Sequence, residues 1–320
     1  MGDLKFISIK DFRPGDIVQN FFYVRESEVK TTANNNKYLD MTLSDATGDV
    51  NAKYWDSSPE NATMFPAGII IKVRGTVQDY QGKLQFRVEN IRRSTESDNL
   101  QIEQYIPSAP ERGEDLLAEI KTVLAGMKDR ELADFTAYVL GKYEDRLVHF
   151  PAAKKNHHAV RDGLLYHTVT MLRSARAIVK VYDFLNADLL YTGVILHDVG
   201  KMEEMEATPL GLVEDYTAGG KLLGHLVQGI NIVAEAAKET GLDPEKALVL
   251  EHMILAHHYE PEFGSPKYPM VPEGEILHYL DIMDARMYDM RKALEGTEPG
   301  HFTEKIWSLD NRTVYKPKWN

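Results

Sequence analysis

The first third of the chain alternates apolar and polar positions with a period of two. Turn-forming residues interrupt the alternation at Asn34 to Asn36, at Thr47-Gly48 and at Gln81-Gly82. Alternating runs between turns predict antiparallel strands. The runs read DIVQNFFYVRESEV, KYLDMTLSD, DVNAKYW, GIIIKVRGTVQDY and KLQFRVENIRR. Five such strands in roughly 90 residues predict a small closed barrel rather than an open sandwich.

From Glu114 onward the apolar residues recur with the period of a helix. The helical runs are LLAEIKTVLAGM, ELADFTAYVLGKYEDRLV, LLYHTVTMLRSARAIVKVY, ADLLYTGVILHDVGKM, LLGHLVQGINIVAEAAKET, PEKALVLEHMILAHH and EILHYLDIMDARMYDMRKALE. Between barrel and helices, STESDNLQIEQYIPSAPERGED is rich in turn-forming residues and predicts a linker. The predicted organisation is a barrel domain over residues 1–95, a linker over 96–112, and an all-α domain with a C-terminal tail over 113–320.

Composition excludes several classes of site. The chain has no cysteine, which excludes disulfides, thiolate zinc sites and cysteine nucleophiles. No run approaches the roughly 18 apolar residues of a membrane span, and the start lacks an apolar signal segment, so we expect a cytoplasmic protein with no membrane partner. The net charge of −12 argues against nucleic acid at first. Residues 1–95, however, hold 13 basic and 12 acidic groups against 24 and 37 in the remainder, so the barrel itself is near neutral.

Histidines and aspartates recur within or at the ends of the apolar helical runs. They are His167 in LLYHT, His197 and Asp198 in ILHDVGK, His225 in GHLVQG, His257 and His258 in ILAHHYE, and Asp281 in HYLDIMD. One such histidine alone is more often a satisfied core residue. An unpaired buried imidazole or carboxylate costs several kcal/mol, and convergence of the whole set on metal removes all of these costs together. Nitrogen and oxygen ligands without sulfur favour manganese, iron or a similar divalent ion.

Lys201 follows His197 by four residues in the run YTGVILHDVGK. Within one helix this spacing places both side chains on the same face, so the ammonium is expected to stand over the metal pocket. A protonated lysine cannot ligate metal, but it can neutralise a phosphate oxygen or stabilise charge in the transition state. The alternative is a lysine at a helix end that is favoured by the helix dipole.

The order H…HD…H…HH…D resembles that of the HD-domain metallohydrolases over roughly residues 113–300. The resemblance implies a core metal site of His167, His197, Asp198 and Asp281, with His225 and His257 as the extra ligands of members that bind two metals. Asp198 is then the bridging ligand, and Asp284 is the alternative for the last ligand. The motif HDxGK occurs in a subset of these phosphohydrolases, which favours a catalytic Lys201 beside Asp198.

The outer face of the barrel offers a candidate surface for single-stranded nucleic acid. Barrels of the OB type commonly bind such strands across strands 2 and 3 through basic and aromatic side chains. The alternation leaves Tyr38, Lys53 and Trp55 outside, where they are expected to form one stacking and charge surface. The alternative is that Trp55 packs under the loop SSPENATMFP.

An N-terminal OB-fold, a linker and an HD domain in this order resemble the YhaM-type 3′-to-5′ exoribonucleases over almost the whole chain. The likeness includes LSDATGDVNAKYWD, NHHAVRDGLLYHT, HHYEPEFGSP and FTEKIWSLDNRTVYKP. Arg161-Asp162 before Gly163 departs from the expected small residue next to the glycine. Arg161 and His258 are further candidates for contact with substrate.

The resemblance implies a metal-dependent exonuclease that releases nucleoside 5′-monophosphates from the 3′ end of single-stranded RNA, with single-stranded DNA as a second candidate substrate. Two ions are expected, with Mn²⁺ as the first candidate and Fe, Co or Mg as alternatives. Two other functions stay open: a cyclic-dinucleotide or nucleotide phosphohydrolase, and a nucleic-acid-binding regulator with an inactive HD domain. A homo-oligomer is also left open.

Overall fold

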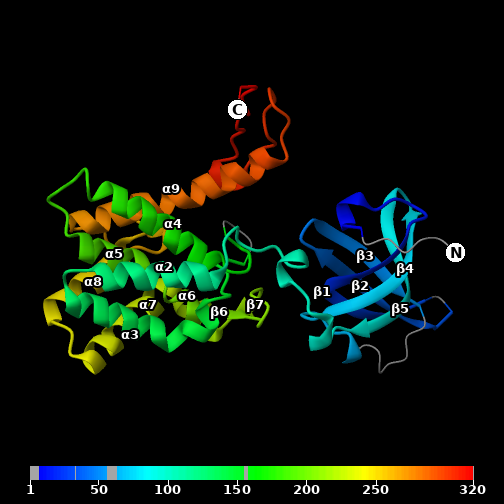
Figure 1. Cartoon of the computed structure of the whole chain (residues 1–320), viewed down its shortest axis with the longest axis horizontal. Coiled ribbons are helices and arrows are strands. Elements are labelled where there is room, and N and C mark those ends of the chain that lie inside the picture. The colour runs from blue at the N-terminus through cyan, green and yellow to red at the C-terminus, as the bar shows by residue number, and fades with distance from the viewer. Residues whose placement is uncertain (1–6, 33, 56–62, 155–157, 320) are drawn as a thin grey trace. The chain divides into compact units, whose positions relative to one another are not determined.

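The chain divides into two compact units, Met1–Ser108 and Ala109–Asn320. The computed structural model describes residues 7–32, 34–55, 63–154 and 158–319. Figure 1 shows a β-barrel in the first unit and packed helices in the second. None of the helices in these described ranges is long and apolar enough to cross a membrane.

The first unit is a closed five-stranded barrel, as the alternation predicts. Its strands are β1 (Ile17–Thr31), β2 (Lys37–Asp45), β3 (Gly48–Tyr54), β4 (Ile70–Tyr80) and β5 (Lys83–Arg93), in the order β1-β2-β3-β5-β4. Neighbouring strands pair antiparallel except β3 and β5, which are parallel, and β4 closes the barrel against β1. A 3-10 turn, η1 (Ile9–Asp11), precedes β1.

The barrel core holds the positions that the alternation places inward. Leu39, Met41 and Leu43 of β2 are buried, and the last two pair with Ala52 and Val50 of β3. Successive side chains of a strand point to opposite faces, so the polar residues between these positions lie on the outer surface of the barrel.

Most of the predicted linker packs on the barrel. It contains the 3-10 turns η2 (Glu96–Asp98) and η3 (Ile102–Gln104). Tyr105 and Ile106 are buried, and the Tyr105 ring meets the Phe21 ring of β1 at 6.1 Å between centroids. The first compact unit accordingly extends to Ser108.

The second unit packs its helices around α5, which contacts α3, α4, α8 and α9. Its helices are α2 (Gly113–Gly126), α3 (Arg130–Leu147), α4 (Gly163–Ile178), α5 (Ala187–Leu196), α6 (Lys201–Glu204), α7 (Ala218–Thr240), α8 (Pro244–Ala256) and α9 (Pro272–Glu295), with 3-10 turns η4 (Pro261–Phe263) and η5 (Trp307–Leu309). A small antiparallel sheet of β6 (Met205–Ala207) and β7 (Val213–Tyr216) adds to the expected helices. Strands this short carry too little alternation to be recognised in the sequence.

Side-chain caps begin several of these helices. The Asn186 side chain accepts from Leu189 N at 3.1 Å at the start of α5, and the Thr217 side chain accepts from Gly220 N at 2.8 Å at the start of α7. Asp243 caps α8 just before a proline in the first turn. These caps satisfy backbone donors that the helix itself leaves free.

The C-terminal tail continues from α9 as an ordered hairpin (Figure 1). Phe302 pairs with Tyr315 in an antiparallel bridge, and Leu309 of η5 is fully buried. The Lys316 ammonium donates to the carbonyls of Leu294 and Thr297 at 2.8 and 2.7 Å. It therefore caps the C-terminal end of α9, where the helix dipole favours a cation.

Candidate metal centre

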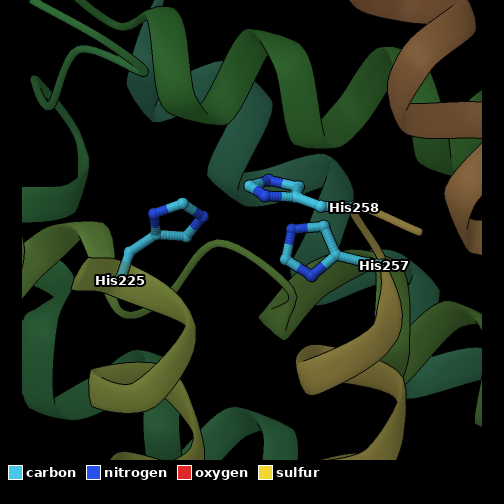
Figure 2. A group of neighbouring side chains, drawn as sticks. All are labelled: His225, His257 and His258. Atoms are coloured by element: carbon cyan, nitrogen blue, oxygen red, sulfur yellow. The ribbon is translucent and has the colours of Figure 1, made fainter. Parts of the chain in front are cut away.

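Three histidine rings face one another where the end of α8 meets α7 (Figure 2). His257 and His258 follow directly after α8, and His225 lies in α7. The ring centroids of His257 and His258 are 4.3 Å apart, and those of His225 and His258 are 5.0 Å apart. One nitrogen from each ring lies within 4.8 Å of the others, which is a spacing that a single metal ion can span. The structure thus groups His258 with two predicted ligands.

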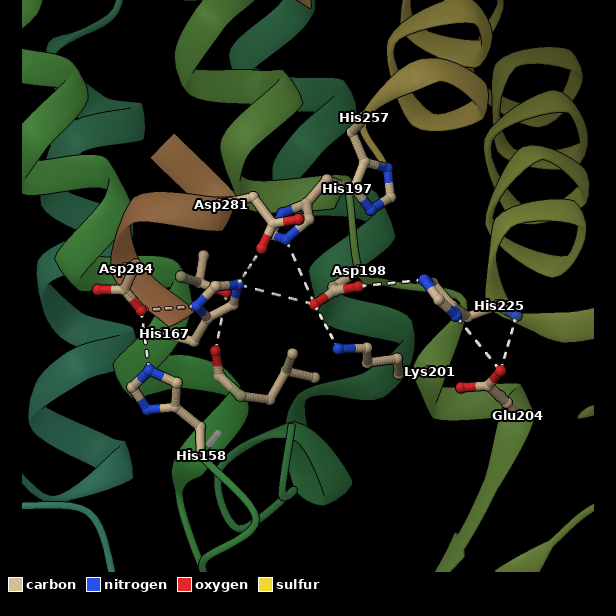
Figure 3. Close-up of polar contacts among 12 residues, drawn as sticks. His158, His167, His197, Asp198, Lys201, Glu204, His225, His257, Asp281 and Asp284 are labelled. Carbon is tan, nitrogen blue, oxygen red and sulfur yellow. Dashed lines mark hydrogen bonds and ion pairs between the residues drawn. The ribbon is translucent and has the colours of Figure 1, made fainter. Parts of the chain in front are cut away.

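The remaining predicted ligands continue this group around Asp198 (Figure 3). Asp198 Oδ2 is 3.3 Å from His197 Nε2 and 3.9 Å from His167 Nε2. Its other oxygen, Oδ1, is 3.6 Å from His225 Nε2. Asp281 Oδ1 lies 3.3 Å from His167 Nε2. Asp198 therefore turns one oxygen toward each of two histidine groups, which is the arrangement that a bridging carboxylate requires.

The chain turns sharply between the histidine and the lysine of the HDxGK motif. Helix α5 ends at Leu196 and α6 begins at Lys201, so the prediction that His197 and Lys201 share one helix is wrong. The turn brings Gly200 against α7, where an added Cβ would lie 2.0 Å from the His225 carbonyl oxygen. Lys201 still reaches the cluster, and its ammonium lies 2.8 Å from Asp198 Oδ2.

Hydrogen bonds to the second ring nitrogen orient the imidazoles. His197 Nδ1 lies 2.8 Å from the Val194 carbonyl oxygen, and His257 Nδ1 lies 2.8 Å from the Ile254 carbonyl oxygen. Because a carbonyl only accepts, each Nδ1 carries the proton and each Nε2 presents its lone pair to the cluster. Both rings are thus held in the tautomer that binds metal.

Glu204 orients His225 in the same way, and the sequence gives no sign of it. Gly224 has a φ of 73° inside α7, which interrupts the helix just before His225. This kink frees the His225 backbone N–H, which donates to Glu204 Oε1 at 3.0 Å, and the same oxygen lies 3.3 Å from His225 Nδ1. The two residues are far apart in sequence, and no periodic pattern links them.

The two aspartates of α9 hold opposite sides of His167. Asp281 faces Nε2 of the ring, whereas Asp284 Oδ2 lies 2.7 Å from Nδ1. The same Asp284 oxygen is 2.8 Å from Nε2 of the buried His158. Asp284 therefore stands behind the imidazole, on the side away from Asp198.

The electrostatics of the cluster are dominated by burial and by the close pairing of opposite charges. Burial opposes a charged His167, but the carboxylates of Asp281 and Asp284 raise its pKa to about 10. Burial would raise the pKa of Asp198, yet the Lys201 ammonium and the neighbouring imidazoles hold it well below its usual range. For His257, burial and the adjacent rings lower the pKa well below its usual range, so this ring stays neutral.

Several buried atoms of the cluster have no hydrogen-bond partner among the described residues. They are Nε2 of His197, His225 and His257, and Oδ1 of Asp198. Leaving a buried polar atom unsatisfied costs about 1–3 kcal/mol. The atoms are all of the nitrogen and oxygen types that bind divalent cations. The residues that carry them are neighbours: the His257 ring centroid lies 5.0 Å from that of His197 and 6.0 Å from that of His225, whose Nε2 is 3.6 Å from Asp198 Oδ1. The donor set therefore fits a divalent metal centre.

The predicted contacts with substrate outside the cluster lie in two places. Tyr38 and Trp55 stack at 4.6 Å between centroids, and Lys53 Nζ stands 4.9 Å from the Tyr38 ring centre. Trp55 is 46% exposed, and residues 57–62 of the loop expected to cover it lie outside the described residues. Arg161 is buried against Asp162, 3.7 Å away, and the Pro209 carbonyl, so it lies outside the histidine cluster.

Comparisons with known proteins match both parts of the chain. A family model described as an HD domain matches residues 164–286, and one described as an OB-fold nucleic acid binding domain matches residues 25–93. The 3′-5′ exoribonuclease YhaM of Geobacillus sp. (strain WCH70) is 41% identical over 309 residues, which cover 97% of this chain and 94% of that protein. These matches confirm the predicted order of an OB-fold barrel followed by an HD domain.

Two solved OB-fold domains are similar to part of this chain. The second OB-fold domain of replication protein A from Methanococcus maripaludis is 20% identical, covers 27% of this chain and 92% of that chain, and has a TM-score of 0.23. An OB domain from Thermoplasma acidophilum is 13% identical, covers 29% and 89% respectively, and also has a TM-score of 0.23.

Proposed function

The chain belongs to the YhaM family of 3′-5′ exoribonucleases, and on this premise we propose that it is a metal-dependent enzyme that degrades single-stranded RNA from the 3′ end to nucleoside 5′-monophosphates. The observation that carries the proposal is the placement of Asp198 between two histidine groups, with Lys201 on one of its oxygens. Single-stranded DNA is a second candidate substrate, and the cytoplasm is the proposed site of action.

The ligand groups in the structure support a centre for two divalent cations, with Mn²⁺ as the first candidate. One group consists of His167, His197 and Asp198, with Asp281 3.3 Å from His167, and the other of His225, His257 and His258, which Asp198 approaches through its second oxygen. In this assignment His258 is a ligand rather than a contact to substrate. Cations held there would supply Lewis-acid charge to the phosphate group and an activated water nucleophile.

Lys201 is the proposed catalytic cation of the chain itself. Burial would lower its pKa, but the charge of Asp198 raises it, so the ammonium stays charged at neutral pH. Its side chain is largely buried and fixed by the 2.8 Å contact to Asp198. A cation that is already in place needs no reorganisation when charge develops on a phosphate oxygen. Lys201 thus orients Asp198 and faces the reacting phosphate.

Asp284 and Glu204 have a positioning role in this proposal. Asp284 holds Nδ1 of His167 and Glu204 holds Nδ1 of His225, so that each imidazole turns Nε2 to the centre. Carboxylates of this kind fix the tautomer and raise the basicity of the ligand. Asp281 is accordingly the last ligand, and Asp284 supports it from behind the ring.

The test is cleavage of a 5′-labelled single-stranded RNA by the purified protein with Mn²⁺. A ladder that shortens from the 3′ end, with release of nucleoside 5′-monophosphates, is expected for the parent and not for Asp198→Asn. The matched control is Asp134→Asn, an exposed carboxylate on α3 whose loss should leave cleavage unchanged. Turnover of small nucleotides alone would favour a nucleotide phosphohydrolase, and RNA that is bound but intact would favour a regulator.

A further inference from the structure

Positive charge on the predicted strand 2 and strand 3 surface of the barrel is already compensated. Lys30 and Lys53 lie 2.7 and 3.3 Å from the same carboxylate, that of Asp40. On the neighbouring part of this face Arg25 pairs with Asp49. A phosphate backbone would have to compete with these carboxylates, so this surface offers stacking by aromatic rings more than charge.

Strands β4 and β5 carry a different set of side chains. Lys72 and Arg74 of β4 and Asn90 and Arg92 of β5, together with Gln19 of β1, line a surface hollow of about 360 Å³. We call these five residues the basic face. Lys72 is the cross-strand partner of Arg92, and Arg74 is the partner of both Asn90 and Gln19, so the five side chains are neighbours.

The charge of this face is poorly neutralised by the protein. Asp98 holds Arg92 through two contacts of 2.6 and 2.8 Å. Neither Lys72 nor Arg74 forms an ion pair with any residue in the described ranges. Like charges directly opposite each other in a sheet are destabilising. An anionic ligand on this face would remove that cost.

Packing holds two of the cations in place. Lys72 Nζ lies 5.1 Å and the Arg92 guanidinium 5.7 Å from the centre of the Phe21 ring, which is buried beneath them. Such cation–π contacts restrict long side chains that would otherwise be mobile. The basic face therefore presents fixed charges, with the amides of Gln19 and Asn90 beside them as hydrogen-bonding groups.

From this geometry we propose that the basic face binds the sugar-phosphate backbone of single-stranded RNA, an inference that rests on the proposed function. Lys72 and Arg74 are two residues apart on one strand, about 7 Å, which is close to the distance between neighbouring phosphates of an extended strand. Arginine and lysine with polar amides are the usual partners of phosphate oxygens. Arg87 of β5, the partner of Lys53, continues the cationic surface toward the Tyr38 and Trp55 stack.

The test is equilibrium binding of a labelled single-stranded RNA, followed by fluorescence anisotropy in EDTA to prevent cleavage, at salt concentrations between about 50 and 200 mM. Each phosphate contact on a single strand contributes about 0.7 to the slope of log K against log salt. Lys72→Glu with Arg74→Glu should therefore make the slope shallower by about 1.4 and weaken binding at least about tenfold at the low-salt end. Lys72→Gln with Arg74→Gln should reproduce the shallower slope with a smaller loss of affinity.

The matched control is Lys10→Glu with Lys83→Glu, the same charge change at residues that line a different hollow of the barrel. It should leave the slope unchanged. An equal loss in this control, or an unaltered slope in a Lys72 and Arg74 variant whose circular dichroism matches the parent, overturns the inference. If the slope of the Lys72 and Arg74 variant is unaltered while the parent still degrades RNA, the inference about the basic face is wrong and the proposed function stands. A parent that neither binds nor degrades RNA overturns the proposed function together with this inference.

Discussion

Replacing Lys201 with methionine removes a buried ammonium and keeps the length of the side chain. In the metal-free protein the ammonium is the cation closest to Asp198 Oδ2, at 2.8 Å, and Asp198 itself is almost fully buried. Removing one partner of a buried ion pair costs about 3–5 kcal/mol because the remaining charge loses its compensation. For a unit of this size each kcal/mol lowers the melting temperature by about 2–4 °C. The metal-free variant should therefore melt on the order of 10 °C below the parent.

Divalent cations change this result, because their charge replaces that of the ammonium beside Asp198. In saturating Mn²⁺ the melting temperature of Lys201→Met should approach that of the parent, so the variant shows the larger metal-induced shift. Bound metal, measured by mass spectrometry, should not fall. Turnover at saturating metal should nevertheless drop by roughly 10²-fold, the loss typical of one transition-state donor. Lys201→Arg keeps the charge but differs in shape and reach, and should restore activity only in part.

Differential scanning fluorimetry with EDTA or Mn²⁺ gives the melting temperatures without and with metal, and single-turnover kinetics gives the rate of the cleavage step. The control is Lys121→Met, which removes an exposed lysine paired with Glu144 at 2.6 Å and should leave the melting temperature unchanged in both conditions. Equal destabilisation of Lys201→Met with and without metal would refute the idea that ammonium and metal compensate the same carboxylate. Full turnover would show that Lys201 is only a charge at a helix end.

The remaining predictions concern the ligands and their supports. Asp198→Asn should abolish hydrolysis and lower bound metal while RNA binding, measured by anisotropy in EDTA, stays close to that of the parent, because the barrel is a separate compact unit. Asp284→Asn should weaken metal affinity about 10–100-fold in a chelator competition, as expected for loss of a carboxylate that orients His167. Asp281→Asn should cost more metal affinity than Asp284→Asn, and the reverse order would exchange their roles. Gly200→Ala should lower the melting temperature in EDTA, because its Cβ would lie 2.0 Å from a carbonyl oxygen of α7.

Local sequence patterns account for the barrel almost completely. The run KYLDMTLSD is strand β2 from end to end, and KLQFRVENIRR is β5, because alternation is enforced by a core on one face and water on the other. The Tyr38 and Trp55 contact follows from the same alternation. The pairing of Lys30 and Lys53 with Asp40 does not follow from the alternation, because Asp40 contacts Lys30 on one neighbouring strand and Lys53 on the other. Pairing across strands decides that arrangement, and no single run contains it.

The helical unit shows the same division between local and long-range information. His167, His197, His225, His257 and Asp281 stand out in the sequence as polar residues within or at the ends of apolar helical runs, and the structure places them near Asp198. Glu204, which holds His225, has no such signal. The break between His197 and Lys201 was not visible, since YTGVILHDVGKM reads as one continuous helix. The apolar pattern continues across this stretch, and the close packing of Gly200 on α7 is a long-range contact that the pattern does not contain.

The choice between the two aspartates of α9 depends on a residue more than a hundred positions away. Asp281 and Asp284 are three positions apart in the sequence and lie on the same helix face, so their spacing alone does not show which of them is the ligand. His158 separates them: its φ of 53° turns the chain before α4, and its buried ring binds Asp284 at 2.8 Å. Gly163 permits this turn, because a Cβ there would lie 2.0 Å from the His158 carbonyl oxygen. Once His158 and His167 share one oxygen of Asp284, that carboxylate is fixed behind the ring, and Asp281 is the one left to face the centre.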